Sequence, residues 1–87
     1  MTSLSGRVTV PGEGAAKNAV VEIHNAKDDV VDQVQTDDDG RYTYHLAPGK
    51  WTAVVWDPYG HRGRAEVELA EGEDKQLDIE LTEGDAR

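Results

Sequence analysis

Hydrophobic and polar residues alternate over seven short stretches of the chain, and glycine, proline, asparagine and aspartate cluster between these stretches. Successive side chains of a β-strand point to opposite faces, so this alternation is typical of strands that bury one face. Clusters of turn-forming residues mark the loops between strands. The pattern therefore predicts a strand in each stretch, at residues 4–10, 19–24, 30–36, 41–46, 50–56, 64–70 and 75–81, followed by a polar tail at 82–87.

The fold class follows from the number and spacing of these strands. No stretch keeps the apolar i, i+3, i+4 spacing of a helix for long enough to predict one. Regular short strands with frequent turn signals predict an all-β sandwich. The in–out alternation favours antiparallel sheets that keep one face in water. The chain of 87 residues is too short for a second core, so we expect one domain over residues 1–87.

The alternation also predicts which side chains form the core. The chain has no phenylalanine, so two tryptophans and three tyrosines supply all of its aromatic volume. We expect Trp51 to be the central core residue. The full inward set is Leu4, Val8, Val10, Val21, Ile23, Val34, Tyr42, Tyr44, Leu46, Trp51, Ala53, Val55, Ala65, Val67, Leu69, Leu77, Ile79 and Leu81.

One stretch places apolar side chains on its outward face. In "KWTAVVWD", residues 50–57, the inward positions begin at Trp51, which puts Val54 and Trp56 on the opposite face. Exposed apolar groups of this kind can mark a partner surface.

The charge balance excludes several classes of partner. The net charge is −9, from 18 acidic against 9 basic residues, and such a surface repels nucleic-acid phosphates and anionic membranes. It favours solubility, a basic partner or a salt-rich habitat. There is no cysteine, hence no disulfide and no thiolate chemistry. The start of the chain lacks the pattern of a signal peptide, which favours the cytoplasm if Met1 is the native start.

Four segments carry a resemblance to a known family: "SGRVTV" at 5–10, "NAVVEIHN" at 18–25, "VVDQVQTDDDGRYTYHLAPGKWTAVV" at 30–55 and "LDIEL" at 77–81. Over residues 4–81 the chain resembles the carboxypeptidase regulatory-like domain, which has the transthyretin-like (prealbumin-like) sandwich. The resemblance implies a seven-strand antiparallel Greek key. One sheet would hold the predicted strands in the order 30–36, 19–24, 50–56, 64–70, and the other in the order 41–46, 4–10, 75–81. Members of this family serve mostly as accessory domains beside enzymes, receptors or surface proteins.

The acidic run Asp37, Asp38 and Asp39 precedes Gly40 and has two interpretations. Aspartates cap their own backbone in turns, and glycine supplies the positive φ that ends a turn, so we interpret the run as a hairpin. A calcium loop needs alternate carboxylates and a distal bidentate acid, whereas these acids are contiguous. A weak Ca²⁺ site at the three aspartates is the alternative, and we predict no other metal and no cofactor.

The sequence gives no catalytic constellation, and we predict that the chain is not an enzyme. His24, His45 and His61 stand singly on outward or loop positions, where we expect them to be solvated. Catalysis would need a base held beside a nucleophile or water. Hydroxyisourate hydrolase shares the transthyretin-like fold, but its C-terminal motif is matched only by the internal "HRGR" at 61–64. Arg7 occupies the strand on which Cna-B-type domains carry an isopeptide lysine, so we expect no isopeptide bond.

These observations predict a non-catalytic module that binds a protein partner or self-associates. In the implied topology, strand 19–24 lies beside strand 50–56. The expected partner-binding residues are therefore Trp56, Val54, Val20, His24 and Tyr59. Tryptophan and tyrosine are enriched in binding hot spots. The alternative is a carbohydrate-binding accessory domain in which Trp56 and Tyr59 stack on sugar rings.

Overall fold

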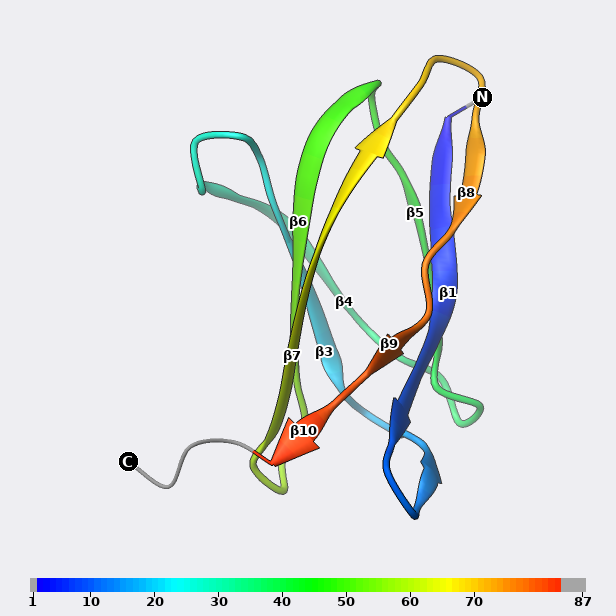
Figure 1. Cartoon of the computed structure of the whole chain (residues 1–87), viewed down its shortest axis with the longest axis vertical. Coiled ribbons are helices and arrows are strands. Elements are labelled where there is room, and N and C mark those ends of the chain that lie inside the picture. The colour runs from blue at the N-terminus through cyan, green and yellow to red at the C-terminus, as the bar shows by residue number, and fades with distance from the viewer. Residues whose placement is uncertain (1, 84–87) are drawn as a thin grey trace.

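The computed structural model describes residues 2–83, which form two β-sheets packed face to face (Figure 1). One sheet has the strand order β10-β7-β6-β3-β4. In the other, β1 pairs with β5 and β2 and also with β8 and β9. The strands are β1 (Ser3–Val10), β2 (Gly14–Ala15), β3 (Val20–His24), β4 (Val30–Gln35), β5 (Arg41–His45), β6 (Gly49–Trp56), β7 (His61–Leu69), β8 (Asp74–Gln76), β9 (Ile79–Glu80) and β10 (Thr82–Glu83).

The all-β sandwich predicted from the sequence is confirmed. The order β4-β3-β6-β7 is the one implied for the first sheet, and β5 beside β1 is the one implied for the second. Within residues 2–83 every regular element is a strand, so this part of the chain contains no helix that could span a membrane.

The C-terminal segment departs from the expected antiparallel arrangement. The predicted strand 75–81 is divided into β8 and β9, and both run parallel to β1. The reason lies at the end of β7, where the chain turns through residues 70–73 and enters the second sheet beside the first residues of β1. Figure 1 shows this segment crossing from β1 toward β7, where β10 pairs with His61 and Arg62. The predicted tail therefore begins as a strand, and its residues 84–87 lie outside the described residues.

Apolar side chains from both sheets fill the space between them. The largest fully buried side chains are Leu4, Val8, Val21, Ile23, Val55 and Leu81. Tyr42 and Tyr44 are buried too, and burial raises the pKa of both phenols. The Tyr44 hydroxyl donates a hydrogen bond of 2.6 Å to the Val21 carbonyl, which joins β5 in one sheet to β3 in the other.

Gly6 on β1 allows the C-terminal segment to approach closely. A Cβ atom at this position would lie 1.8 Å from the Leu77 carbonyl oxygen. The Tyr42 hydroxyl donates to that same oxygen. Residue 6 must therefore be glycine because the backbone of Leu77 approaches β1 so closely.

Trp51 is not the central core residue that the alternation predicts. Its position on β6 does face inward and the ring packs against the core, but the side chain is only partly buried. β3 ends at His24, which pairs with Thr52, so β3 stops one residue short of Trp51. The fully buried centre is aliphatic instead.

Candidate functional site

Three loops share one hydrogen-bond pattern: two join paired strands of the first sheet, and the third joins β4 to β5 in the other sheet. In each, an Asn or Asp side-chain oxygen accepts the backbone N–H groups two and four residues later. The first residues of the loops are Asn25, Asp37 and Asp57. The residue three positions later has positive φ: Asp28 at 67°, Gly40 at 75° and Gly60 at 93°. Each is a three-residue loop that ends in a left-handed residue. The loops at Asn25 and Asp57 close hairpins, whereas the loop at Asp37, predicted as a hairpin, crosses from β4 to β5 in the other sheet.

The carboxylate of Asp37 is engaged by its own turn. Its Oδ1 accepts the N–H groups of Asp39 and Arg41, each at 2.9 Å. The bond from Arg41 in particular holds the pKa of Asp37 below its usual range. Gly40 is fixed as glycine by its positive φ and by the Val8 carbonyl oxygen, which would lie 2.4 Å from a Cβ atom. The acidic run therefore has the geometry of a turn.

Within residues 2–83 no three side chains of histidine, cysteine, aspartate or glutamate are arranged to hold a metal ion.

The expectation of singly placed, solvated histidines is wrong for His24. Its Nε2 lies 2.7 Å from Glu22 Oε1 and its Nδ1 lies 3.0 Å from Asp28 Oδ1, and its side chain is 13% exposed. Ionised carboxylates only accept hydrogen bonds, so this arrangement favours the imidazolium form, in which both ring nitrogens carry a proton. The bond to Glu22 raises the pKa of His24 most, and Asp28 adds to it, which together outweigh the opposing effect of burial.

His61 is likewise held by a carboxylate rather than solvated. Its Nδ1 lies 2.7 Å from Asp57 Oδ2, and its Nε2 lies 4.0 Å from Glu13 Oε2. Burial acts to raise the pKa of Asp57, but the hydrogen bonds from His61 and Tyr59 outweigh it and hold the pKa below its usual range. His45 on β5 is exposed, as expected.

The predicted outward face of β6 forms as expected from the alternation. Val20 on β3 lies directly opposite Trp56, and Glu22 lies opposite Val54. Directly opposite residues of an antiparallel pair project from the same face. Val20, Val54 and Trp56 therefore share the outer face of the sheet, where all three are partly exposed. We call these three residues the outer patch.

Two arginines that are not among the predicted binding residues lie beside the outer patch. Arg62 on β7 is opposite Trp56, and Arg64 is opposite Val54. The strand predicted at 64–70 begins three residues later than β7, which leaves Arg62 in the predicted loop before it. The alternation of Arg62, Gly63 and Arg64 in the sequence is the signal that could have extended the predicted strand to residue 62. Trp56, the two arginines and His61 line an open hollow of about 630 Å³.

The other two predicted binding residues lie apart from the outer patch. His24 is on the same face, opposite Thr52, but its ring is held between Glu22 and Asp28. Tyr59 is 82% exposed in the turn after β6. Within residues 2–83 the aromatic rings that contact one another are those of Tyr42 and Tyr44, so Trp56 and Tyr59 do not form a joint platform.

Comparison with known proteins gives a family and two structural relatives. The model of the carboxypeptidase regulatory-like domain matches residues 3–82. The chain is similar in structure to the TIE protein of Bacillus anthracis, with a TM-score of 0.79 and 23% identity over 93% of this chain and 17% of that one. It is also similar to a DUF3823 family protein from Parabacteroides merdae, with a TM-score of 0.70 and 20% identity over 94% of this chain and 46% of that one.

At these identities the likeness shows the fold alone. The chain spans less than half the length of either protein, 17% of one and 46% of the other. No curated protein matches the sequence.

Proposed function

Because this chain belongs to the carboxypeptidase regulatory-like domain family, whose members are non-catalytic, we propose that it is an accessory domain that binds a protein partner. The binding surface is the outer patch together with Arg62 and Arg64. The observation that carries the proposal is the partly exposed Trp56, which the register places between Val20 and Arg62 on the face of a paired sheet.

The physical case rests on what this surface gains when it is covered. Trp56 is large and partly wet, and apolar area removed from water contributes about 25 cal/mol per Å². Tryptophan and arginine are the residue types most enriched in binding hot spots. A paired sheet also holds the outer patch rigidly, so little conformational entropy is lost on binding.

The charges beside the outer patch indicate the chemistry of the partner. The chain as a whole carries a charge of −9, which predicts a basic partner, but Arg62 and Arg64 make this flank locally basic. Arg64 lies 3.8 Å from Glu66, in a pair so exposed that it holds the arginine weakly. The outer patch therefore fits a partner that presents an apolar side chain flanked by carboxylates.

The test is photo-crosslinking from the outer patch. The photoreactive residue p-benzoylphenylalanine would replace Trp56, and in a matched control it would replace Thr43, an exposed residue on β5 of the other sheet. Irradiation of cells that make the protein should give a discrete protein adduct from position 56 and none from position 43.

Two results would overturn the proposal. The absence of an adduct at position 56, or the same adducts from both positions, would show that the outer patch is not a specific contact. If the adduct contained only a second copy of this chain, the surface would serve self-association and not the binding of an acidic partner.

A further inference from the structure

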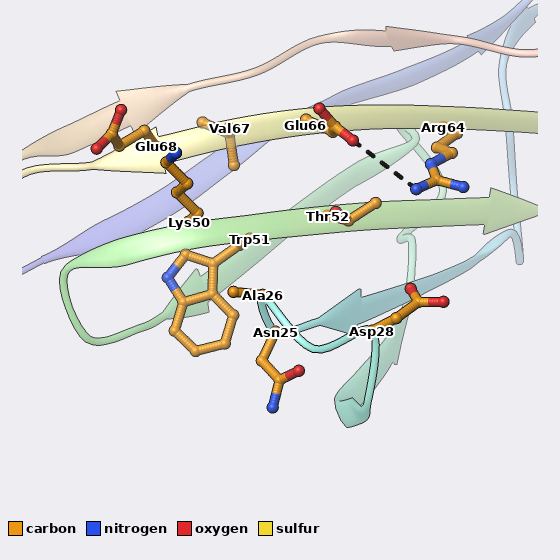
Figure 2. Close-up of a pocket in the computed structure, with 10 residues that line it drawn as sticks. All are labelled: Asn25, Ala26, Asp28, Lys50, Trp51, Thr52, Arg64, Glu66, Val67 and Glu68. Atoms are coloured by element: carbon orange, nitrogen blue, oxygen red, sulfur yellow. Dashed lines mark ion pairs between the residues drawn. The ribbon is translucent and has the colours of Figure 1, made fainter.

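A second hollow, of about 420 Å³, lies at the other end of β6, around Trp51 (Figure 2). It arises because β3 ends at His24, opposite Thr52, whereas β6 continues back to Gly49 along β7. The chain leaves β3 in the turn that starts at Asn25, and this leaves a step beside the beginning of β6. Figure 2 shows the Trp51 ring extending over this step toward Asn25 and Ala26.

The Trp51 ring is fixed in place, and its polar atom is satisfied. The indole N–H donates a hydrogen bond of 2.9 Å to the Ala47 carbonyl. The ring packs against the core and also lines the hollow. The hollow therefore has a rigid aromatic wall that needs no further hydrogen bond.

The rim of the hollow offers both donors and acceptors. Asn25 Oδ1 accepts the N–H groups of Lys27 and Asp29, so its amide nitrogen is the part of the side chain that can donate to a ligand. The hydroxyl of Thr52 also lines the hollow.

The charges around the rim nearly balance. Lys50 lies opposite Glu68 in the register of β6 and β7, and Figure 2 shows Arg64 paired with Glu66 farther along β7. With Asp28, the lining holds three carboxylates and two cations. A ligand with a strong charge of either sign would meet like charges, whereas a neutral ligand rich in hydroxyl groups could pair with both kinds.

We propose that the hollow at Trp51 binds a neutral oligosaccharide. The C–H face of one sugar ring would stack on the indole, and its hydroxyl groups would bond to the rim. Most side chains that line the hollow beside Trp51 are polar or charged, which suits a ligand rich in hydroxyl groups, and a volume of about 420 Å³ lies within the usual range of ligand sites. This hollow shares Arg64 with the proposed protein-binding surface but is built on Trp51 instead of Trp56, so variants of the two tryptophans test the two proposals separately.

The two tryptophans allow the site to be tested by fluorescence. Trp56→Leu leaves Trp51 as the only indole, and Trp51→Leu leaves only Trp56. Each variant would be titrated with cellohexaose, xylohexaose, maltohexaose and chitohexaose. We expect one of these sugars to change the fluorescence of Trp56→Leu in a saturable way and to leave that of Trp51→Leu unchanged. Calorimetry should show binding to Trp51→Leu about tenfold weaker than to the unchanged chain.

A second pair of variants keeps the test valid if Trp51→Leu does not fold. The double variant Lys50→Ala with Glu68→Gln retains the ring and changes two rim residues, and it should weaken the same sugar about tenfold. Thr43→Ala, on the other sheet, should bind it as the unchanged chain does. The proposal is overturned if none of the four sugars gives a saturable change in Trp56→Leu, if Trp51→Leu responds equally, or if the rim variant binds unchanged.

Discussion

Thr36 joins three parts of the chain through its side chain. The residue is 4% exposed, its hydroxyl donates 2.6 Å to the Ala16 carbonyl, and its Oγ1 accepts the Ala19 N–H at 3.0 Å. These bonds tie the segment before β3 to the end of β4. The predicted inward set lacks Ala16 and Ala19, both of which are buried. Ala16 lies in a short segment between strands, where no alternation marks it, whereas Ala19 is in phase with Val21 and Ile23 at the start of the predicted strand 19–24.

Thr36→Val should destabilise the domain by about 1–3 kcal/mol, since the isosteric change leaves a buried N–H and a buried carbonyl without partners. Denaturant unfolding measures the effect. Thr43→Val, at an exposed position on β5, is the control and should stay within about 0.5 kcal/mol of the unchanged chain. Equal stability of the two variants would show that the Thr36 hydrogen bonds do not matter.

The charged ring of His24 predicts a pH dependence. Its pKa is raised above the ordinary value of 6.5 by Glu22 and Asp28, so the protonated ring stabilises the folded state. This contribution is complete below pH 6.5 and is lost as the pH rises through the higher pKa of the folded state. The melting temperature of the unchanged chain should therefore exceed that of His24→Gln most at pH 5.5, and the difference should shrink above pH 6.5. A difference that stays constant with pH, or grows, would contradict the imidazolium.

The three shared turns show how single residues define an element. Each loop begins with an Asn or Asp whose side chain accepts hydrogen bonds from the backbone of its own loop, and a left-handed residue ends it. The sequence identified the loops from their composition. It could not show that the same geometry occurs three times, because one left-handed position is Asp28 rather than glycine.

The turn geometry at Asp37 predicts the response to calcium. Its Oδ1 already accepts two backbone N–H groups, so added Ca²⁺ should leave the melting temperature unchanged beyond the effect of NaCl at equal ionic strength. Saturable stabilisation by Ca²⁺ above that control would establish the alternative site at the three aspartates.

The edge strand β4 carries a charged residue that disfavours pairing with strands of other chains. Val30 and Val31 are 53% and 48% exposed, and β4 is the last strand of its sheet. Asp32 lies opposite the core residue Ile23, and its carboxylate accepts the Gln33 backbone N–H at 2.8 Å. An inward-facing charge of this kind discourages edge-to-edge association.

Asp32→Val should therefore make the domain associate with itself. Light scattering should show a mass that rises with concentration. Asp38→Val, which removes the same charge from an exposed turn position, should remain like the unchanged chain. Equal association of both variants would point to lost charge repulsion instead of the exposed edge.

At the scale of the whole molecule, the sequence predicted the sheets better than the site. Alternation identified the central strands and the outer patch because each signal lies within one strand. The parallel placement of β8 and β9, the step that exposes Trp51 and the ion pairs of His24 and His61 all depend on where segments distant in the chain meet. A pattern read along one strand carries no information on those contacts.

The uneven distribution of charge also emerges only at this scale. The chain carries −9 overall, yet two of its nine basic residues, Arg62 and Arg64, lie side by side with the outer patch. Salt would screen the general acidity and the local attraction alike, but it would leave the apolar contact of Trp56 in place.

The most direct measurement uses the partner protein that is crosslinked at position 56. It compares the affinity of that partner for two variants of this chain that carry the same change in charge. Trp56→Lys should weaken binding about 30-fold or more, as loss of a hot-spot tryptophan does, with an unchanged melting temperature. Thr43→Lys should bind like the unchanged chain. If Trp56→Lys binds as tightly as Thr43→Lys, or loses binding only because it unfolds, the outer patch is not the surface through which this domain binds its partner.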